Sequence, residues 1–159
     1  MAQTARRNLS GGKVPEFGQG SRQENLDQRQ RVRTKGWQVV NVPDNINASQ
    51  VSYNLLTKNR YAQTVINVYQ PGQRDEMHCH PGSEHIFLVF QGELHIRGIN
   101  EGEDITLRPG ELVHINQSYP YQLCNDTDGI TVLYQVATRP PKPSKIGTYI
   151  LPPEFQPTD

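Results

Sequence analysis

The sequence predicts an all-β domain whose strands close into a barrel or jelly roll. Short runs of β-branched and aromatic residues recur along the chain, and glycines separate them at hairpin-like intervals. No stretch has the 3.6-residue apolar periodicity of a long amphipathic helix. Closing the sheet removes exposed strand edges and leaves a mouth where inward side chains can hold a ligand.

The first 36 residues are expected to form a flexible polar arm that precedes the barrel. They hold eight Lys and Arg and three acidic residues, a net charge of +5, and the rest of the chain carries −5. Aromatic residues interleaved with basic ones, typical of a nucleic-acid groove, are absent from the arm. We therefore interpret the arm as a solvated tail and expect no nucleic-acid partner.

Residues 37–159 are expected to form a single barrel domain with an extended C-terminal tail. The run 85–90 is apolar nearly throughout, which predicts a strand buried on both faces. A proline-rich connector, 139–143, should end the barrel before a short late strand at 145–151. The other expected strands are Trp37–Val42, Val51–Leu56, Ala62–Tyr69, Glu76–His80, Leu94–Arg97, Asp104–Leu107, Glu111–Ile115, Tyr121–Asn125 and Ile130–Ala137.

The sequence indicates a cytoplasmic protein. Its two cysteines suggest no disulfide framework, and the N-terminal residues lack the apolar core of a secretory signal. No apolar run approaches the length of a membrane span, so a membrane is not expected as a partner.

Three histidines, His78, His80 and His85, lie within eight residues. Side chains alternate across a strand, so His78 and His80 should face one interior while Cys79 faces away. A turn after His80 would bring His85 back across from it. Neutral imidazole is a common ligand for zinc, iron, copper and nickel, so this spacing predicts a metal site.

Residues 72–92 resemble the first motif of the cupin superfamily. Its members are small β-barrels that hold a metal ion inside the barrel. Gly72 precedes the His78-x-His80 pair by the usual gap, Pro81 follows it, and Gly92 closes the motif. Counting back from Gly92 places His85 at the position where the family usually has glutamate. Glu84 would serve only if the turn shifts by one residue, and we prefer His85 because strand register aims the ligand inward.

The second cupin motif is degenerate in this chain. Asn125 matches its terminal asparagine, and Tyr121 then occupies the usual histidine position. The resemblance implies a metal held by His78, His80 and His85, with Tyr121 as either a fourth ligand or a general acid/base. A third interpretation is that Tyr121 fills the barrel mouth as an amphipathic aromatic side chain whose hydroxyl is hydrogen-bonded.

The resemblance implies three alternative functions. The first is a metal-dependent enzyme acting on a small organic anion, with a mononuclear iron dioxygenase as the leading class and Fe²⁺ as the first metal. The second is a redox-silent isomerase, cyclase, decarboxylase or lyase using Zn²⁺, Ni²⁺ or Mn²⁺. The third is a non-catalytic cupin that binds a small molecule. Cupins commonly pair sheets across subunits, so a homodimer is also implied, with an N-terminal strand such as 37–42 crossing over.

Other polar residues carry weaker predictions. His114 lies between apolar Val113 and Ile115, so parity points it away from the core, and His95 is likewise expected on the exposed face. Both Cys79 and Cys124 should pack as small buried side chains. Arg74 and Gln63 are near the expected mouth, where either could contact a substrate carboxylate.

Overall fold

The computed structural model describes residues 38–138 and 148–158 of the chain. These residues form ten β-strands and two single-turn 3₁₀ helices, η1 (Pro43–Asn45) and η2 (Pro153–Phe155). The expected arm, 1–36, and the whole proline-rich connector, 139–143, lie outside the described residues. The strands are β1 (Ser52–Lys58), β2 (Ala62–Tyr69), β3 (His78–Cys79), β4 (His85–Gln91), β5 (Leu94–Gly98), β6 (Asp104–Leu107), β7 (Leu112–Ile115), β8 (Tyr121–Cys124), β9 (Thr131–Thr138) and β10 (Tyr149–Ile150).

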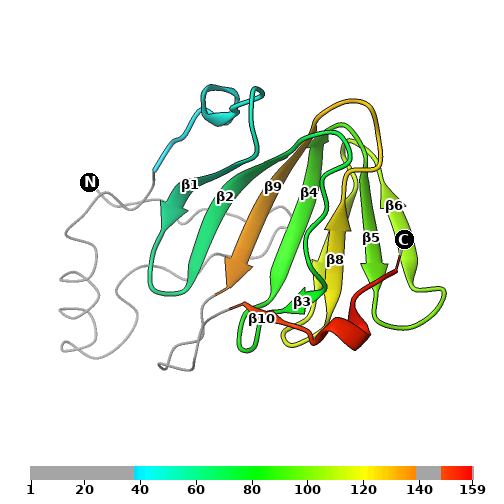
Figure 1. Cartoon of the computed structure of the whole chain (residues 1–159). Coiled ribbons are helices and arrows are strands. Elements are labelled where there is room, and N and C mark those ends of the chain that lie inside the picture. Colours follow the sequence, from blue (N-terminus) through cyan, green and yellow to red (C-terminus); the bar gives the residue numbers. More distant parts are fainter. Residues whose placement is uncertain (1–37, 139–147, 159) are drawn as a thin grey trace, which may run out of the picture. The chain divides into compact units, whose positions relative to one another are not determined.

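The strands form two five-stranded sheets in which every pair is antiparallel. The first sheet has the order β1-β2-β9-β4-β7, and the second has the order β10-β3-β8-β5-β6 (Figure 1). The chain repeatedly crosses between the sheets, which brings distant segments together in a jelly-roll arrangement. The predicted all-β class is therefore confirmed.

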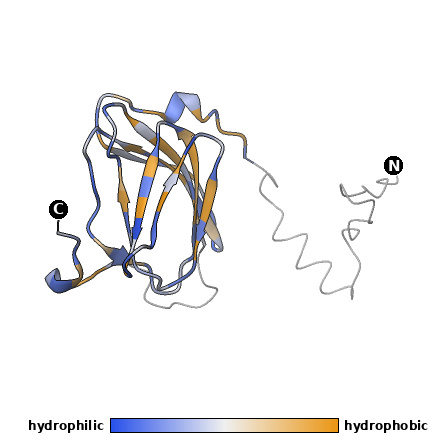
Figure 2. Cartoon of the chain, turned by 90° about the vertical axis from the view of Figure 1, so that its right-hand side faces the viewer, coloured by the Kyte–Doolittle hydropathy of each residue, from blue (hydrophilic) through white to orange (hydrophobic). Residues whose placement is uncertain are grey.

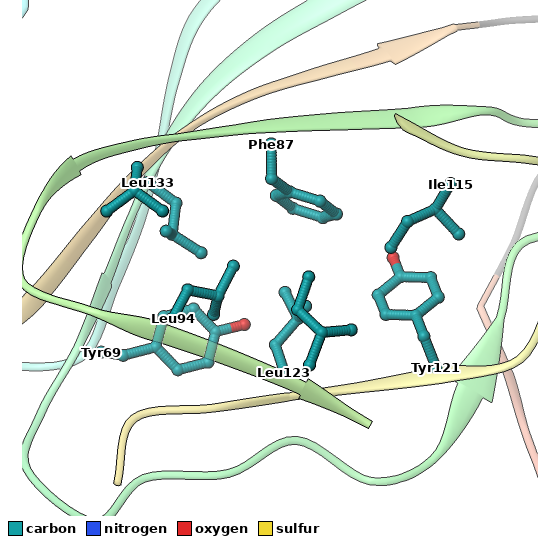
Figure 3. Close-up of a cluster of buried hydrophobic side chains, with 9 residues drawn as sticks. Tyr69, Phe87, Leu94, Ile115, Tyr121, Leu123 and Leu133 are labelled. Atoms are coloured by element: carbon teal, nitrogen blue, oxygen red, sulfur yellow. The ribbon is translucent and has the colours of Figure 1, made fainter. Parts of the chain in front are cut away.

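The core lies between the two sheets. Phe87 of β4 and Leu133 of β9 project from the first sheet toward Leu94 of β5 and Leu123 of β8 in the second (Figure 3). Each is nearly inaccessible to solvent, and burying one such side chain contributes about 1.5–3 kcal/mol. This packing holds the sheets together at one end and leaves the other end of the interior for polar side chains.

Polarity alternates along several strands, as Figure 2 shows by hydropathy. In β2, Val65 faces the interior, whereas Ile66 and Val68 face outward and are also fully buried. A second apolar cluster covers these outward residues, with Val42 and Ile46 packed against it from the segment around η1. Strand β2 is therefore buried on both faces from Val65 to its end at Tyr69.

Two strand predictions were wrong. Residues 38–42 form no strand, because the chain turns at Pro43 into η1, where the N–H groups of Asn45 and Ile46 bond to the carbonyls of Val42 and Pro43. Strand β4 is also not buried on both faces. His85, Phe87 and Val89 are buried, but the alternate residues are half-buried and Phe90 is exposed, because the outer cluster does not extend over this part of the sheet.

Gly92 lies in the turn that joins β4 to β5 and has a φ of +79°. A Cβ at this position would be 2.4 Å from the Ile130 carbonyl oxygen and 2.9 Å from the Thr131 Cα. Both the left-handed backbone and the close approach require glycine. The glycine that closes the first cupin-like motif is thus a structural necessity of this hairpin.

The C-terminal segment is fixed to the strand that carries His78. The Gln156 side chain accepts a hydrogen bond from the Met77 N–H at 2.8 Å and donates to the carbonyls of Met77 and Leu151 at 3.1 and 2.9 Å. Met77, Cys79 and Leu151 form a small buried cluster beneath this contact. Strand β3 has only two residues, and it is paired with β10 on one side and β8 on the other. None of the described residues belongs to a helix long and apolar enough to cross a membrane.

Candidate metal centre

A cavity of about 830 Å³ opens between the two sheets at the polar end of the interior. Inward residues of β1, β2, β4, β8 and β9 line it, together with the β3 segment. All four residues predicted for the site line this cavity, namely His78, His80, His85 and Tyr121. The described lining has one cationic side chain, Lys58 at the exposed end of β1, and one carboxylate, Asp75.

The three imidazoles form a row inside the cavity. The ring centroids of His78 and His80 are 4.9 Å apart, and those of His80 and His85 are 4.0 Å apart. Alternation along β3 explains the first pair, because Cys79 between them packs on the opposite side against Met77 and Leu151. The turn at Ser83, whose N–H bonds to the His80 carbonyl, starts the return that brings His85 back.

His85, rather than Glu84, reaches the cavity. His85 is 6% exposed and lies among the lining residues. The Glu84 carboxylate instead pairs with His114 Nε2 at 3.2 Å on the outer face, where both side chains are nearly half exposed. Residues 84 and 85 thus take opposite faces of the sheet, as strand parity requires.

Hydrogen bonds occupy Nδ1 in the rings of His78 and His85. His78 Nδ1 lies 2.7 Å from the Glu76 carbonyl oxygen, so this nitrogen carries the proton and donates it. His85 Nδ1 lies 2.9 Å from the Tyr121 hydroxyl and 3.2 Å from Gln135 Nε2. The Nε2 atoms of His78 and His85 have no hydrogen-bond partner among the residues that the structure describes.

His85 is held in its neutral form. Burial, followed by the proximity of His80 and His78, lowers the pKa of His85 to about 3. A cation in this position would lose its hydration and would be repelled by any charge on its neighbours. Neutral imidazole is also the form that binds metals, so the environment favours a ligand over a charged acid.

Tyr121 projects from β8 into the apolar cluster between the two sheets (Figure 3). It is 3% exposed, and its ring centroid is 4.6 Å from that of His78. Burial, with smaller contributions from Asp75 and Cys79, raises the pKa of Tyr121 far above its usual value. The side chain is therefore a neutral hydroxyl that bonds His85, which matches the amphipathic interpretation of this residue.

Asp75 was not singled out by the sequence. Its carboxylate accepts a hydrogen bond from the Tyr69 hydroxyl at 2.7 Å inside the cavity. Burial raises the pKa of Asp75, while the Tyr69 hydrogen bond and the nearby His78 act in the opposite direction. The segment 73–75 is irregular and is held by the bond from the Asp75 N–H to the Leu123 carbonyl, so no strand parity could have predicted its orientation.

Two amide side chains were also missed. Asn67 of β2 donates to Gln135 of β9 at 2.7 Å, and both are buried in the cavity wall. Asn67 lies between inward Val65 and Tyr69, and Gln135 lies between inward Leu133 and Ala137. A polar residue at an inward position of an apolar strand is the signal that could have found them.

Asn125 is fully buried beside the cavity. Its amide nitrogen donates to the carbonyls of Tyr69, Gln70 and Gly129, and its side-chain oxygen accepts from the Thr127 N–H and hydroxyl. These bonds tie the end of β2 to the turn between β8 and β9. The residue that matches the second cupin motif therefore has a structural role in this chain.

The remaining candidates lie away from the cavity, apart from Gln63. The exposed His114 is on the outer face of β7, as parity predicts. His95 is half-buried rather than exposed, because its Nδ1 lies 2.7 Å from the carboxylate of Asp126. Arg74 pairs with the same carboxylate at 3.0 Å, so it does not face the cavity.

Gln63 lines the cavity mouth and donates to the Tyr53 hydroxyl at 2.9 Å. Cys79 and Cys124 are both buried free thiols, as expected. Burial raises the pKa of Cys124 to about 11.

The donor set fits a divalent transition metal chemically, although the rings do not surround a common point. Among the described residues, no group of three or more His, Cys, Asp or Glu side chains is arranged around an ion position. The chemistry of the row is nevertheless that of a ligand set, because His85 is neutral and the Nδ1-bonded ring of His78 presents Nε2. Binding would require the rings to turn toward one point within the cavity.

Comparisons with known proteins agree with this architecture. Residues 65–137 match the family model of the cupin domain. Comparison with curated protein sequences gives no match. Among solved structures, the protein TT1209 from Thermus thermophilus is 18% identical, with a TM-score of 0.58 over 65% of this chain and 98% of that chain.

Two further structures share the fold at similarly low identity. A conserved protein with a double-stranded β-helix domain from Klebsiella pneumoniae is 15% identical, with a TM-score of 0.60 over 73% of this chain and 98% of that chain. A cupin superfamily protein from Desulfitobacterium hafniense is 16% identical, with a TM-score of 0.51 over 59% and 82% of the two chains. The family match assigns residues 65–137 to a cupin domain, and the solved structures share the two-sheet fold that contains it.

Proposed function

We propose that the chain is a metal-dependent cupin enzyme that acts on a small organic anion. The observation that carries the proposal is the row of three imidazoles inside a cavity of about 830 Å³. A structural cluster needs no such cavity, and buried polar rings beside open space are typical of a binding site.

His78, His80 and His85 would hold the ion, with Fe²⁺ first and Zn²⁺, Ni²⁺ or Mn²⁺ as alternatives. Three neutral imidazoles would leave a bound divalent ion its full +2 charge, which would polarise an anionic substrate. Because they are only three ligands, they would also leave coordination positions open for the substrate. The Glu76 carbonyl orients the His78 ring through Nδ1. Lys58 at the mouth adds a positive charge that favours entry of an anion.

Tyr121 would act as a neutral hydroxyl beside the ligands. Its strongly raised pKa disfavours a phenolate ligand and suits a group that donates a hydrogen bond or a proton to the substrate. Its position 2.9 Å from His85 Nδ1 holds the hydroxyl at the edge of the imidazole row.

Two reaction classes follow from different features of the cavity. Three neutral ligands would leave open coordination positions on the metal ion. This favours an iron dioxygenase, whose iron must accommodate both substrate and dioxygen. The Asp75–Tyr69 pair favours the second class, a redox-silent lyase, isomerase, cyclase or decarboxylase. A carboxyl group with a raised pKa beside the site could exchange a proton with the substrate.

The test is metal content and metal binding in matched histidine variants. Wild-type protein purified without chelators is analysed for bound metals and titrated with Fe²⁺ and Zn²⁺ by calorimetry. We expect about one ion per chain, lost in His80→Ala and retained in His114→Ala, the exposed control. Failure of the wild type to bind any of these ions would overturn the proposal and favour a non-catalytic cupin.

Oxygen uptake then separates the two reaction classes. Consumption of dissolved oxygen by the Fe²⁺ form with a panel of small organic acids supports the dioxygenase. Turnover of such acids by the Zn²⁺, Ni²⁺ or Mn²⁺ form without oxygen supports the redox-silent class.

We also propose that the chain forms a homodimer through the edge of the first sheet. Strand β1 is the edge strand there, and it exposes Tyr53 and Leu55 together with the preceding Val51. Edge strands with exposed apolar side chains readily pair with another chain. Sedimentation velocity should give a dimer for the wild type and a monomer for Leu55→Asp. A monomeric wild type at micromolar concentration would contradict the proposal.

A further inference from the structure

A buried chain of hydrogen bonds leads outward from the His85 ring. Asn67 Nδ2 donates to Gln135 Oε1 at 2.7 Å, and Gln135 Nε2 lies 3.2 Å from His85 Nδ1. The Tyr121 hydroxyl lies 2.9 Å from the same nitrogen. Asn67, Gln135 and His85 come from β2, β9 and β4, and each is at most 7% exposed.

The direction of this chain determines which nitrogen of His85 carries the proton. A ring nitrogen of neutral imidazole either donates one hydrogen bond or accepts one. Because Asn67 donates to the oxygen of Gln135, the amide of Gln135 presents its NH₂ group to His85. Nδ1 must then accept, and the proton lies on Nε2.

Metal binding through Nε2 requires the opposite tautomer. The proton must move to Nδ1, and Nδ1 then needs an acceptor. The Tyr121 hydroxyl can accept or donate, so it permits either tautomer. Gln135 can accept only if its amide turns its oxygen toward His85, which also reverses its bond with Asn67.

We propose that Asn67 and Gln135 form a positioning relay that sets the tautomer of His85 and thereby the affinity of Nε2 for a metal ion. The effect on metal affinity rests on the proposed function, whereas the effect on the tautomer does not. Asn67 acts only through Gln135, because none of its hydrogen bonds reaches the ring. Changes to groups that orient a histidine ligand typically alter metal affinity by about 10–100-fold.

Asn67→Asp tests the relay from a distance. A carboxylate can only accept, so Gln135 would turn its NH₂ toward residue 67 and its oxygen toward His85. The His85 proton should then move from Nε2 to Nδ1 in the metal-free protein. Long-range ¹H–¹⁵N correlation spectra of histidine-labelled protein at pH 8 report the tautomer directly, and the His85→Asn spectrum identifies the signal.

Calorimetric titration with Zn²⁺ tests the consequence for binding. We expect Asn67→Asp to bind Zn²⁺ at least about tenfold more tightly than the wild type. Gln63→Glu is the matched control, because it adds the same charge on the same strand at the cavity mouth but outside the relay. The increase in Zn²⁺ affinity in Asn67→Asp must exceed any increase in Zn²⁺ affinity in this control.

Gln135→Glu keeps the test decisive if Asn67→Asp does not fold. Its carboxylate accepts from both Asn67 and His85, so it predicts the same Nδ1–H tautomer. An unchanged tautomer in the folded variant overturns the relay, as does a wild type that already carries the proton on Nδ1. A tautomer that switches while no variant binds Zn²⁺ supports the relay and counts against the metal site.

Discussion

Acidification should destabilise the metal-free protein because His85 binds a proton far less readily when folded. The pKa of His85 falls from an ordinary value of 6.5 to about 3 in the folded state. The unfolded chain therefore binds more protons than the folded chain below pH 6.5. The contribution of neutral His85 to stability is complete above that pH and is lost as the pH falls toward 3.

The size of the effect follows from the two pKa values. Each unit of difference corresponds to about 1.4 kcal/mol. Between pH 7 and pH 5, His85 alone should lower the free energy of unfolding by about 2 kcal/mol. Asp75 acts in the opposite direction, because its raised pKa removes an unfavourable buried charge as the pH falls.

Urea unfolding in the presence of a chelator measures this change. The free energy of unfolding at pH 7 and pH 5 is compared between the wild type and His85→Asn, which retains Asp75 and the other titrating groups. The wild type should lose about 2 kcal/mol more than the variant over this interval. Equal losses in the two proteins would refute the assignment of His85 as a buried neutral imidazole.

Three further predictions concern the framework around the site. Asn125→Ala removes a fully buried set of side-chain hydrogen bonds and should lower the free energy of unfolding by about 3–5 kcal/mol in urea titrations, whereas a loss below about 1 kcal/mol would contradict this role. Gly92→Ala should lower the melting temperature more than Gly110→Ala, because both have positive φ but only the first would place a Cβ against backbone. Cys79 and Cys124 should react with a disulfide reagent at pH 8 at least about 100-fold more slowly than in urea, and rapid labelling of the folded protein would disprove their burial.

Strand parity predicted the part of the fold and of the site that depends on local sequence. The bounds of β2 match the predicted run 62–69, and the inward placement of His78, His80 and His85 follows from alternation and one turn. Glu84 and His114 lie on the outer face for the same reason. These features need only neighbours a few residues apart.

The missed features depend on which strands become neighbours. Asn67 and Gln135 are 68 residues apart in sequence and meet only because β2 pairs with β9. Asp75 lies in a segment held by backbone bonds to β8 rather than in a regular strand. The expected double burial of β4 failed because the covering cluster around Ile66 lies elsewhere on that sheet. Each of these features depends on the strand topology, which local sequence patterns do not determine.

Because the Gln156 side chain is hydrogen-bonded to the main chain of Met77, the C-terminal segment helps to position the adjacent His78. Strand β3 has two residues and a single paired position with β8, and the Gln156 amide bonds both main-chain groups of Met77, the residue just before it. Removal of the segment around Gln156 by a protease would therefore leave the barrel intact but make the position of the His78 ring less fixed. Loss of ligand binding after storage, with an unchanged melting profile, would point to trimming at this end.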